Sequence, residues 1–109
     1  MRFPKSARLV RPEEFAAVKA GGVRVRAGSM AIGFLAGEAP RLGIAASRAV
    51  GSAVQRNRIR RVVREFFRTN RTRFPKGDCV VIPGAGSSKL SNGELRDLLM
   101  TALQKLAAA

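Results

Sequence analysis

The chain has 109 residues, which is enough for one hydrophobic core, so we expect residues 1–109 to form a single domain. One cysteine, Cys79, and the absence of histidine exclude an internal disulfide and a His/Cys zinc site. No apolar run approaches the roughly 20 residues that span a bilayer, and the basic N-terminus lacks the apolar run of a secretory signal. We therefore expect a cytoplasmic protein, with Cys79 as a small buried residue of a strand.

Charge is the strongest signal in the composition. There are 21 Lys and Arg residues against 7 Asp and Glu, a net charge of +14, and 16 of the basic residues are arginines. Such an excess repels itself in a compact protein, so a polyanion is the expected partner. Arginine favours phosphate because its planar guanidinium can donate two hydrogen bonds at once. Nucleic acid fits better than an anionic membrane, because a membrane-binding helix would expose bulky apolar residues that the core needs.

The first half of the chain predicts a short helix followed by strands. Residues 12–14, Pro-Glu-Glu, are typical of a first helical turn, and the glycines at 21 and 22 end that helix, which presents Phe15 and Val18. Between residues 23 and 47 apolar residues recur with a period of two, with breaks at 27–28 and 37–40. This pattern predicts three short antiparallel strands in a meander.

A second helix has the clearest signals in the sequence. It starts at a capping box, Ser52 with Gln55, and its periodic pattern continues to about Arg68. At about 100° per residue, its side chains separate into two faces. The apolar face contains Ile59, Val62, Val63, Phe66 and Phe67. The opposite face contains Asn57, Arg60, Arg61, Arg64 and Arg68.

The last third predicts one more strand and one more helix. A turn at residues 74–77 leads into a strand at 79–82, and residues 83–86 leave it. Ser91 and Glu94 form a second capping box, and leucines at helical spacing follow to Leu106 and predict core packing. The order α-β-β-β-α-β-α predicts an α+β sandwich, a four-stranded sheet with helices packed on it.

The segment from Arg56 to Arg73 has one-sided charge, with eight arginines and one acid, Glu65. An ordinary solvated helix face mixes both signs, because like charges four residues apart cost a few tenths of a kcal/mol per pair. This face therefore predicts phosphate binding rather than simple solvation.

Catalysis by the chain itself is not expected from its residue inventory. Without histidine there is no imidazole base, and the seven acids are too scattered to suggest the converging carboxylates of a metal site. Ser47 and Ser52 have no basic partner at a recognisable spacing. The glycines at 84 and 86 are not followed by the lysine of a phosphate loop, because Lys89 comes too late.

Two stretches have a recognisable pattern: residues 41–48, RLGIAASR, and residues 51–65, GSAVQRNRIRRVVRE, which contain an Arg-Asn-Arg helix. Together they resemble a known family, the protein subunit of bacterial ribonuclease P, whose hallmark is this helix. The resemblance extends over nearly the whole chain in the family's order. It implies that two parallel strands are joined by a left-handed crossover around the arginine helix, an exception to the usual right-handed rule.

The resemblance also implies a function, that of a protein cofactor of a catalytic RNA. That RNA would hold the magnesium and remove the 5′ leader of precursor tRNA by metal-dependent hydrolysis, while the protein alone would bind no metal. The implied partners are the catalytic RNA and precursor tRNA, with no membrane. The implied RNA contacts are Arg48, Arg56, Asn57, Arg58, Arg60, Arg61, Arg64 and Arg68. The implied leader-binding cleft, between the first helix and the sheet, has Phe15, Lys19, Phe34 and Ser47, with Lys19 at the place of a second aromatic residue of the family.

Three alternatives stay open on the residues alone. A ribosomal or other RNA-binding protein of similar fold would have the same composition. A DNA-binding helix-turn-helix protein would use Gly51 as its turn, although the sequence before Gly51 is strand-like. A self-sufficient ribonuclease would need a base and metal ligands that the inventory does not suggest.

Overall fold

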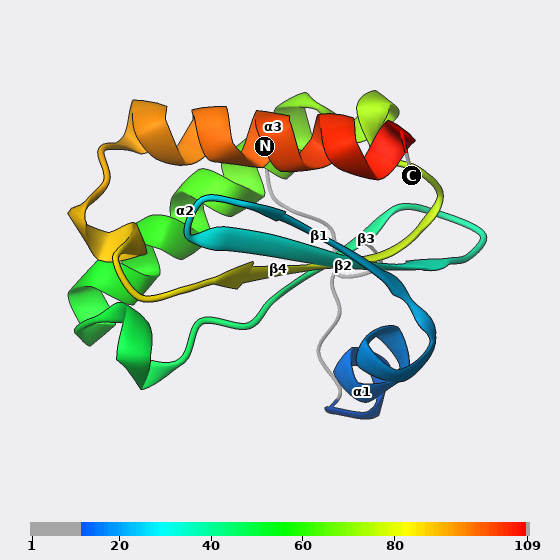
Figure 1. Cartoon of the computed structure of the whole chain (residues 1–109), viewed down its shortest axis with the longest axis horizontal. Helices are drawn as coiled ribbons and strands as arrows, with labels where there is room; N and C mark the ends of the chain where they lie inside the picture. The colour runs from blue at the N-terminus through cyan, green and yellow to red at the C-terminus, as the bar shows by residue number, and fades with distance from the viewer. Residues whose placement is uncertain (1–11, 109) are drawn as a thin grey trace.

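The structure, a computed structural model, describes residues 12–108, and its helices pack on a four-stranded sheet (Figure 1). The N-terminal segment in which we expected no secretory signal lies outside this range. The predicted order of helices and strands is confirmed. The elements are α1 (Pro12–Gly21), β1 (Val23–Ala27), β2 (Met30–Ala36), β3 (Arg41–Ile44), η2 (Arg48–Val50), α2 (Ala53–Thr69), η3 (Arg71–Arg73), β4 (Gly77–Pro83), η4 (Ser87–Lys89) and α3 (Asn92–Ala108).

The strands lie in the order β1-β2-β4-β3. β1 pairs with β2 and β2 with β4 in antiparallel fashion, whereas β3 pairs with β4 in parallel, with Leu42 opposite Cys79. The predicted three-stranded meander is therefore wrong, because β4 lies between β2 and β3. The apolar run of β4 explains its central place, since five of its seven residues are buried, whereas β3 has only four residues and lies at an edge.

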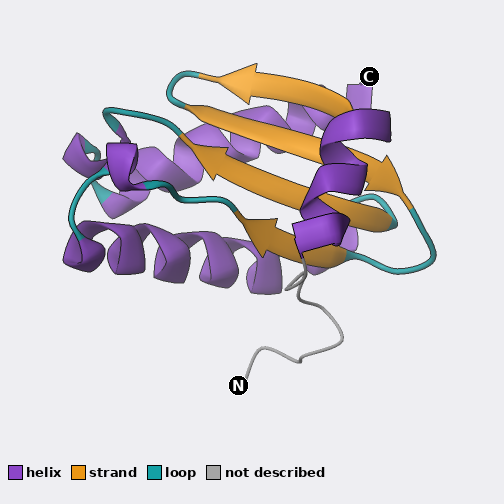
Figure 2. Ribbon diagram, turned by 90° about the horizontal axis from the view of Figure 1, so that it is seen from below, coloured by secondary structure: helices purple, strands orange, loops and turns teal. Residues whose placement is uncertain are grey.

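The parallel pair is connected through α2. Parallel neighbours cannot be joined by a tight turn, because the chain must return to the starting edge of the sheet before the second strand begins. α2 makes this return along the β3 edge of the sheet, on the side away from α1 (Figure 2), and the resulting β3-α2-β4 connection is left-handed. The hand that the resemblance implied is the one observed, against the usual preference.

The sheet separates two layers of helices. Among the described residues, α2 and α3 cover one face and α1 covers the other (Figure 2). The main core, between the sheet and the α2–α3 layer, includes the fully buried Met30, Ile32 and Phe67. A smaller cluster around Val18 and Val80 joins α1 to the opposite face. The protein therefore has two separate helix layers, one formed by α2 and α3 and the other by α1, on opposite faces of the sheet.

Candidate nucleic-acid interface

α2 begins at the predicted capping box. The Ser52 hydroxyl accepts a hydrogen bond from the Gln55 backbone N–H at 3.2 Å, and Gln55 Oε1 accepts one from the Ser52 N–H at 2.8 Å. Gly51, with φ of 152°, makes this closure possible, because a Cβ there would lie 2.2 Å from Gln55 Oε1. The first turn of the helix is thereby fixed, and with it the direction of the arginines that follow.

The two faces of α2 are those that the sequence predicts. Its buried residues are Ile59, Val62, Val63, Phe66 and Phe67. On the other face Asn57, Arg61 and Arg64 are exposed and Arg60 is half-buried. Arg60 donates a long 3.4 Å hydrogen bond to Asn57 Oδ1. Within residues 12–108, no carboxylate pairs with Arg60, Arg61 or Arg64.

The two arginines of the Arg-Asn-Arg motif differ from the rest of this face. Arg58 is half-buried and donates to Asn92 Oδ1 at 2.7 Å and to the backbone oxygen of Ser88 at 3.0 Å. Arg56 is also half-buried, and its Nε is enclosed without a hydrogen-bond partner in the described part of the chain. Arg58 is therefore directed toward α3. Arg48, on η2 just before α2, is exposed.

Glu65 is the one acid on α2, and it pairs with Arg68. Both guanidinium contacts of this pair join residues three apart on the helix, one of them at 3.2 Å. The hydrogen bond from Arg68 lowers the pKa of Glu65 below its ordinary value. Glu65 is therefore ionised at neutral pH and occupies Arg68, so Arg68 is less free for an external anion than Arg61 or Arg64.

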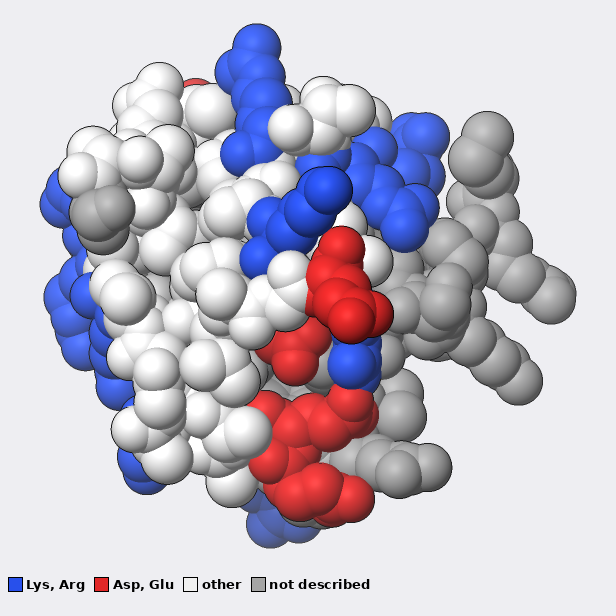
Figure 3. All heavy atoms as spheres, turned by 90° about the vertical axis from the view of Figure 1, so that its right-hand side faces the viewer, with Lys and Arg blue, Asp and Glu red and all other residues white. Residues whose placement is uncertain are grey.

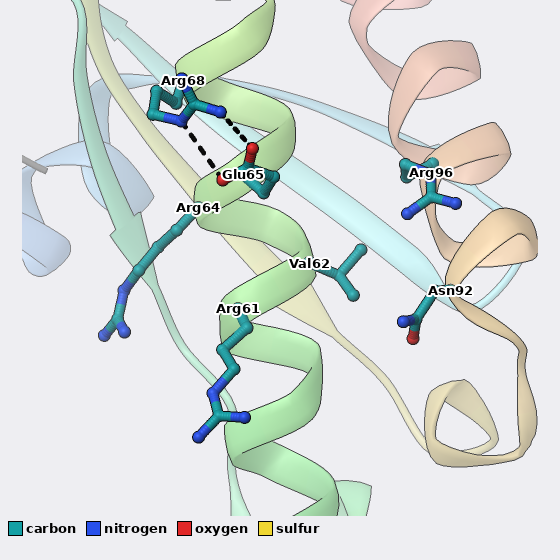
Figure 4. A pocket seen from close by; sticks show the side chains of 7 residues that line it. All are labelled: Arg61, Val62, Arg64, Glu65, Arg68, Asn92 and Arg96. Atoms are coloured by element: carbon teal, nitrogen blue, oxygen red, sulfur yellow. Dashed lines mark hydrogen bonds and ion pairs between the residues drawn. The ribbon is translucent and has the colours of Figure 1, made fainter. Parts of the chain in front are cut away.

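A pocket of about 480 Å³ lies between α2 and α3 (Figure 4). Arginines from both helices are among its lining residues. Val62 points into the space between the helices, whereas Arg61 and Arg64 extend from the other side of α2. Its lining residues are Arg61, Val62, Arg64, Glu65, Arg68, Asn92 and Arg96. The cationic surface of α2 therefore continues onto the first turns of α3.

A second pocket, of about 350 Å³, lies between α1 and the sheet, in the place of the predicted leader cleft. Phe15 and Lys19, one helical turn apart on α1, both line it. Gly33 forms part of its floor, where a Cβ would lie 3.1 Å from Val18 Cγ1. The residues lining the cleft are Phe15, Val18, Lys19, Gly22, Val23, Arg24, Gly33, Ala45, Val80 and Ile82.

The structure does not bring Phe34 or Ser47 into this cleft. Successive side chains of a strand point to opposite faces of the sheet, so Phe34 points away from the face on which Gly33 lines the cleft. It is half-buried and packs against the main core. Ser47 is exposed before η2, and Ala45 is the residue of that segment that lines the cleft.

α1 is joined to the sheet by an ion-pair cluster around Arg41. The Arg41 guanidinium pairs with Glu14 of α1 and lies 3.6 Å from Asp78 Oδ1 of β4. Figure 3 shows acidic side chains gathered together on one face of the protein. Because Arg41 contacts acids from two elements, it helps to hold α1 in position over the cleft.

Cys79 matches its prediction, since it is fully buried in β4. Burial, with a smaller contribution from the charge of Asp78, raises the pKa of its thiol to about 12. The thiol is therefore protonated at neutral pH and poorly nucleophilic. Across residues 12–108, no three His, Cys, Asp or Glu side chains are grouped as metal ligands.

Sequence reasoning missed three polar residues of these surfaces, Arg24, Asn92 and Arg96. Arg24 lies on β1 and lines the cleft. The alternating pattern of that strand was the sequence signal that could have identified it. Asn92 and Arg96 lie one turn apart at the start of α3 and line the α2–α3 pocket. The spacing of these two residues was visible in the sequence, but the packing of α3 beside α2 was not.

The family to which these surfaces belong follows from comparison with known proteins. The sequence model of the family described as Ribonuclease P matches residues 3–107. The chain belongs to this family. It is 38% identical to the ribonuclease P protein component of Syntrophobacter fumaroxidans, over 95% of this chain and 92% of that protein. It is 36% identical to that of Desulforapulum autotrophicum, with the same coverages.

Solved structures of ribonuclease P proteins share the fold. The protein from Thermotoga maritima has a TM-score of 0.80 and 31% identity, over 90% of this chain and 96% of that one. The protein from Staphylococcus aureus has a TM-score of 0.89 and 24% identity, over 94% and 96%. The resemblance stated from residues 41–65 is thus confirmed.

Family membership makes this chain a protein component of ribonuclease P, a ribonucleoprotein of tRNA processing, with the ribonuclease P RNA as its partner. It excludes the ribosomal and helix-turn-helix alternatives, and the element before α2 is the short η2 after a strand rather than a partner helix. None of the helices formed by residues 12–108 combines the length and apolarity needed to cross a membrane.

Proposed function

We propose that α2 binds the phosphate backbone of the ribonuclease P RNA. The observation that carries this proposal is the row of Arg60, Arg61 and Arg64, for which residues 12–108 supply no carboxylate partner. These like charges repel each other on one helix face, and phosphates in contact with them relieve that repulsion while releasing counterions. Arg48 and Asn57, both exposed near the start of α2, extend the same surface.

The test is a triple variant, Arg60→Ala with Arg61→Ala and Arg64→Ala. Its affinity for the ribonuclease P RNA is measured over a range of salt concentrations, after circular dichroism has shown that it is folded. A control that removes three charges elsewhere is Lys76→Gln with Lys89→Gln and Lys105→Gln, since none of these lysines lies on α2. The arginine variant should bind more weakly than the control, with a slope of log affinity against log salt smaller by about 2–3. Equal behaviour of the two variants would overturn the proposal.

The cleft between α1 and the sheet is the proposed site for the single-stranded leader of precursor tRNA. Phe15 provides an aromatic surface for a base, and Lys19, one turn away, is exposed for a phosphate. Val23, at 50% exposure, adds an apolar wall. Phe34 has no place in this contact, because it packs against the main core.

The leader contact is tested on the assembled enzyme. Precursor tRNA with several leader nucleotides is compared with mature tRNA, which has no leader to bind. Wild-type enzyme should prefer the precursor, and Phe15→Ala with Lys19→Ala should reduce that preference while leaving affinity for mature tRNA in place. Equal loss of affinity for both RNAs would assign Phe15 and Lys19 to folding or general attraction, and an unchanged preference would place the leader elsewhere.

Chemistry at the scissile phosphate is proposed to belong to the RNA. Within residues 12–108, no group of three His, Cys, Asp or Glu side chains is placed to hold a metal ion. We propose that the catalytic RNA holds the magnesium. Protein free of contaminating nuclease, incubated with precursor tRNA and magnesium, should leave it intact until the RNA is added, and specific 5′ cleavage by the protein alone would contradict this assignment.

A further inference from the structure

The first turns of α3 carry a cation that the arginine motif of α2 does not include. Arg96 is exposed, lies one turn after Asn92, and has no hydrogen bond or ion pair within the described chain. Its neighbour Leu95 is completely buried, so the packing of α3 fixes Arg96 on the outer side of the helix. Figure 4 shows Arg96 and Asn92 across the pocket from the residues of α2.

The position of Arg96 relative to α2 is held by a cross-helix contact. Arg58 of α2 donates to Asn92 at the start of α3 and to the backbone of Ser88 just before it. These two hydrogen bonds hold α2 against both η4 and the beginning of α3. These hydrogen bonds fix the start of α3 against α2, so Arg96 is held on a helix that lies beside α2.

The charge around the pocket favours an anion that extends over both helices. Four arginines line it against one carboxylate, and that carboxylate, Glu65, is already paired with Arg68. Val62 supplies a small apolar area between the charged rims. A phosphodiester backbone matches this arrangement, because its charges recur along a strand and can follow one surface from Arg61 and Arg64 to Arg96.

We propose that the RNA-binding surface extends across the α2–α3 pocket and that Arg96 binds a backbone phosphate of the ribonuclease P RNA there. This inference rests on the proposed function of α2, and it adds a second helix to the contact. An acidic protein segment is the competing occupant of such a pocket. The continuity with the α2 arginines favours RNA over a separate partner.

The test compares Arg96→Gln with Lys76→Gln, which removes the same charge from an exposed turn outside the pocket. Binding of each full-length protein to the ribonuclease P RNA is measured over a range of salt concentrations. Arg96→Gln should weaken binding about fivefold more than Lys76→Gln at ~0.1 M salt, the value of one exposed ion pair. Its salt slope should fall by about 0.7–0.9, the value for one phosphate. Arg96→Glu should weaken binding further, and Arg96→Lys should restore most of it.

The triple variant of Arg60, Arg61 and Arg64 is measured in the same series, so that the two proposals fail separately. If the triple variant is weakened and Arg96→Gln behaves as Lys76→Gln, the extension onto α3 is overturned while RNA binding by α2 stands. If neither differs from its charge control, both proposals are overturned. If Arg96→Gln loses affinity for the RNA but keeps the wild-type salt slope, the inference is also contradicted. Such a substitution would have removed something other than a phosphate contact.

Discussion

The guanidinium of Arg58 donates a 2.7 Å hydrogen bond to Oδ1 of Asn92, a residue 34 positions later in the chain. The second arginine of the Arg-Asn-Arg motif therefore contacts another helix of its own protein. Arg61, one turn further on, has an exposed side chain with no such contact. The motif combines residues that hold the scaffold with residues that face outward.

Replacing Arg58 with Ala should lower the free energy of unfolding by about 1–2 kcal/mol, because two charge-assisted hydrogen bonds are lost. Urea denaturation followed by circular dichroism measures this change. Arg61→Ala serves as the control and should leave the midpoint nearly unchanged. Equal midpoints for the two variants would show that the Arg58 contact contributes nothing to folding.

Replacing Glu65 with Gln should strengthen binding of the ribonuclease P RNA, because it removes the single acid of α2 and releases Arg68. The salt dependence should become steeper, by up to one phosphate contact. Since Arg68 lowers the pKa of Glu65, the carboxylate stays ionised at neutral pH, and the difference from wild type should persist until the pH falls below the ordinary range of a carboxyl group. Glu38→Gln, an exposed acid in a loop, is the control, and an equal gain there would indicate a general charge effect.

Replacing Gly33 with Ala should distort the leader cleft, because the new methyl group would occupy its floor and lie 3.1 Å from Val18 Cγ1 of α1. We expect a smaller preference for precursor over mature tRNA in the assembled enzyme, with unchanged binding of the catalytic RNA. Gly93→Ala is the matched control, since a methyl group there meets its nearest neighbour at 3.9 Å. Full preference for precursor in a folded Gly33→Ala enzyme would place the leader away from this floor.

Cys79 should resist thiol reagents at pH 8 in the folded protein and react at once after unfolding in urea. Burial raises the pKa of this thiol to about 12 from an ordinary value of 9.0. Between these two values the unfolded chain ionises while the folded protein keeps its proton, so this group lowers stability as the pH rises above about 9. Rapid modification of native protein at pH 8 would contradict this prediction, and Cys79→Ala identifies any reaction elsewhere.

The helices were predictable because their signals are local. Ser52 with Gln55 and Ser91 with Glu94 both form the capping boxes read from their spacing. The two faces of α2 follow from helical periodicity alone. Local sequence also places Phe15 and Lys19 on one side of α1, where both line the cleft.

Strand pairing and long-range contacts were not predictable in the same way. Nothing in residues 41–44 states that their partner is β4 rather than β2, because the choice depends on a strand more than thirty residues later. The misplacement of Phe34 has a similar cause, since one step along a strand changes the face of the sheet. The direction of Arg58 depends on Asn92, which belongs to an element that packs beside α2 only in the folded protein.

The central place of β4 has a consequence for how the protein is made. The second edge of β2 stays uncovered until β4, which lies about forty residues later in the chain, has been synthesised. At roughly 5–20 residues per second on the ribosome, that interval lasts about 2–8 seconds. The arginine helix is synthesised within this interval, before the strand that joins it to the centre of the sheet. A fragment that ends before Gly77 would leave both β2 and β3 without the neighbour that they share.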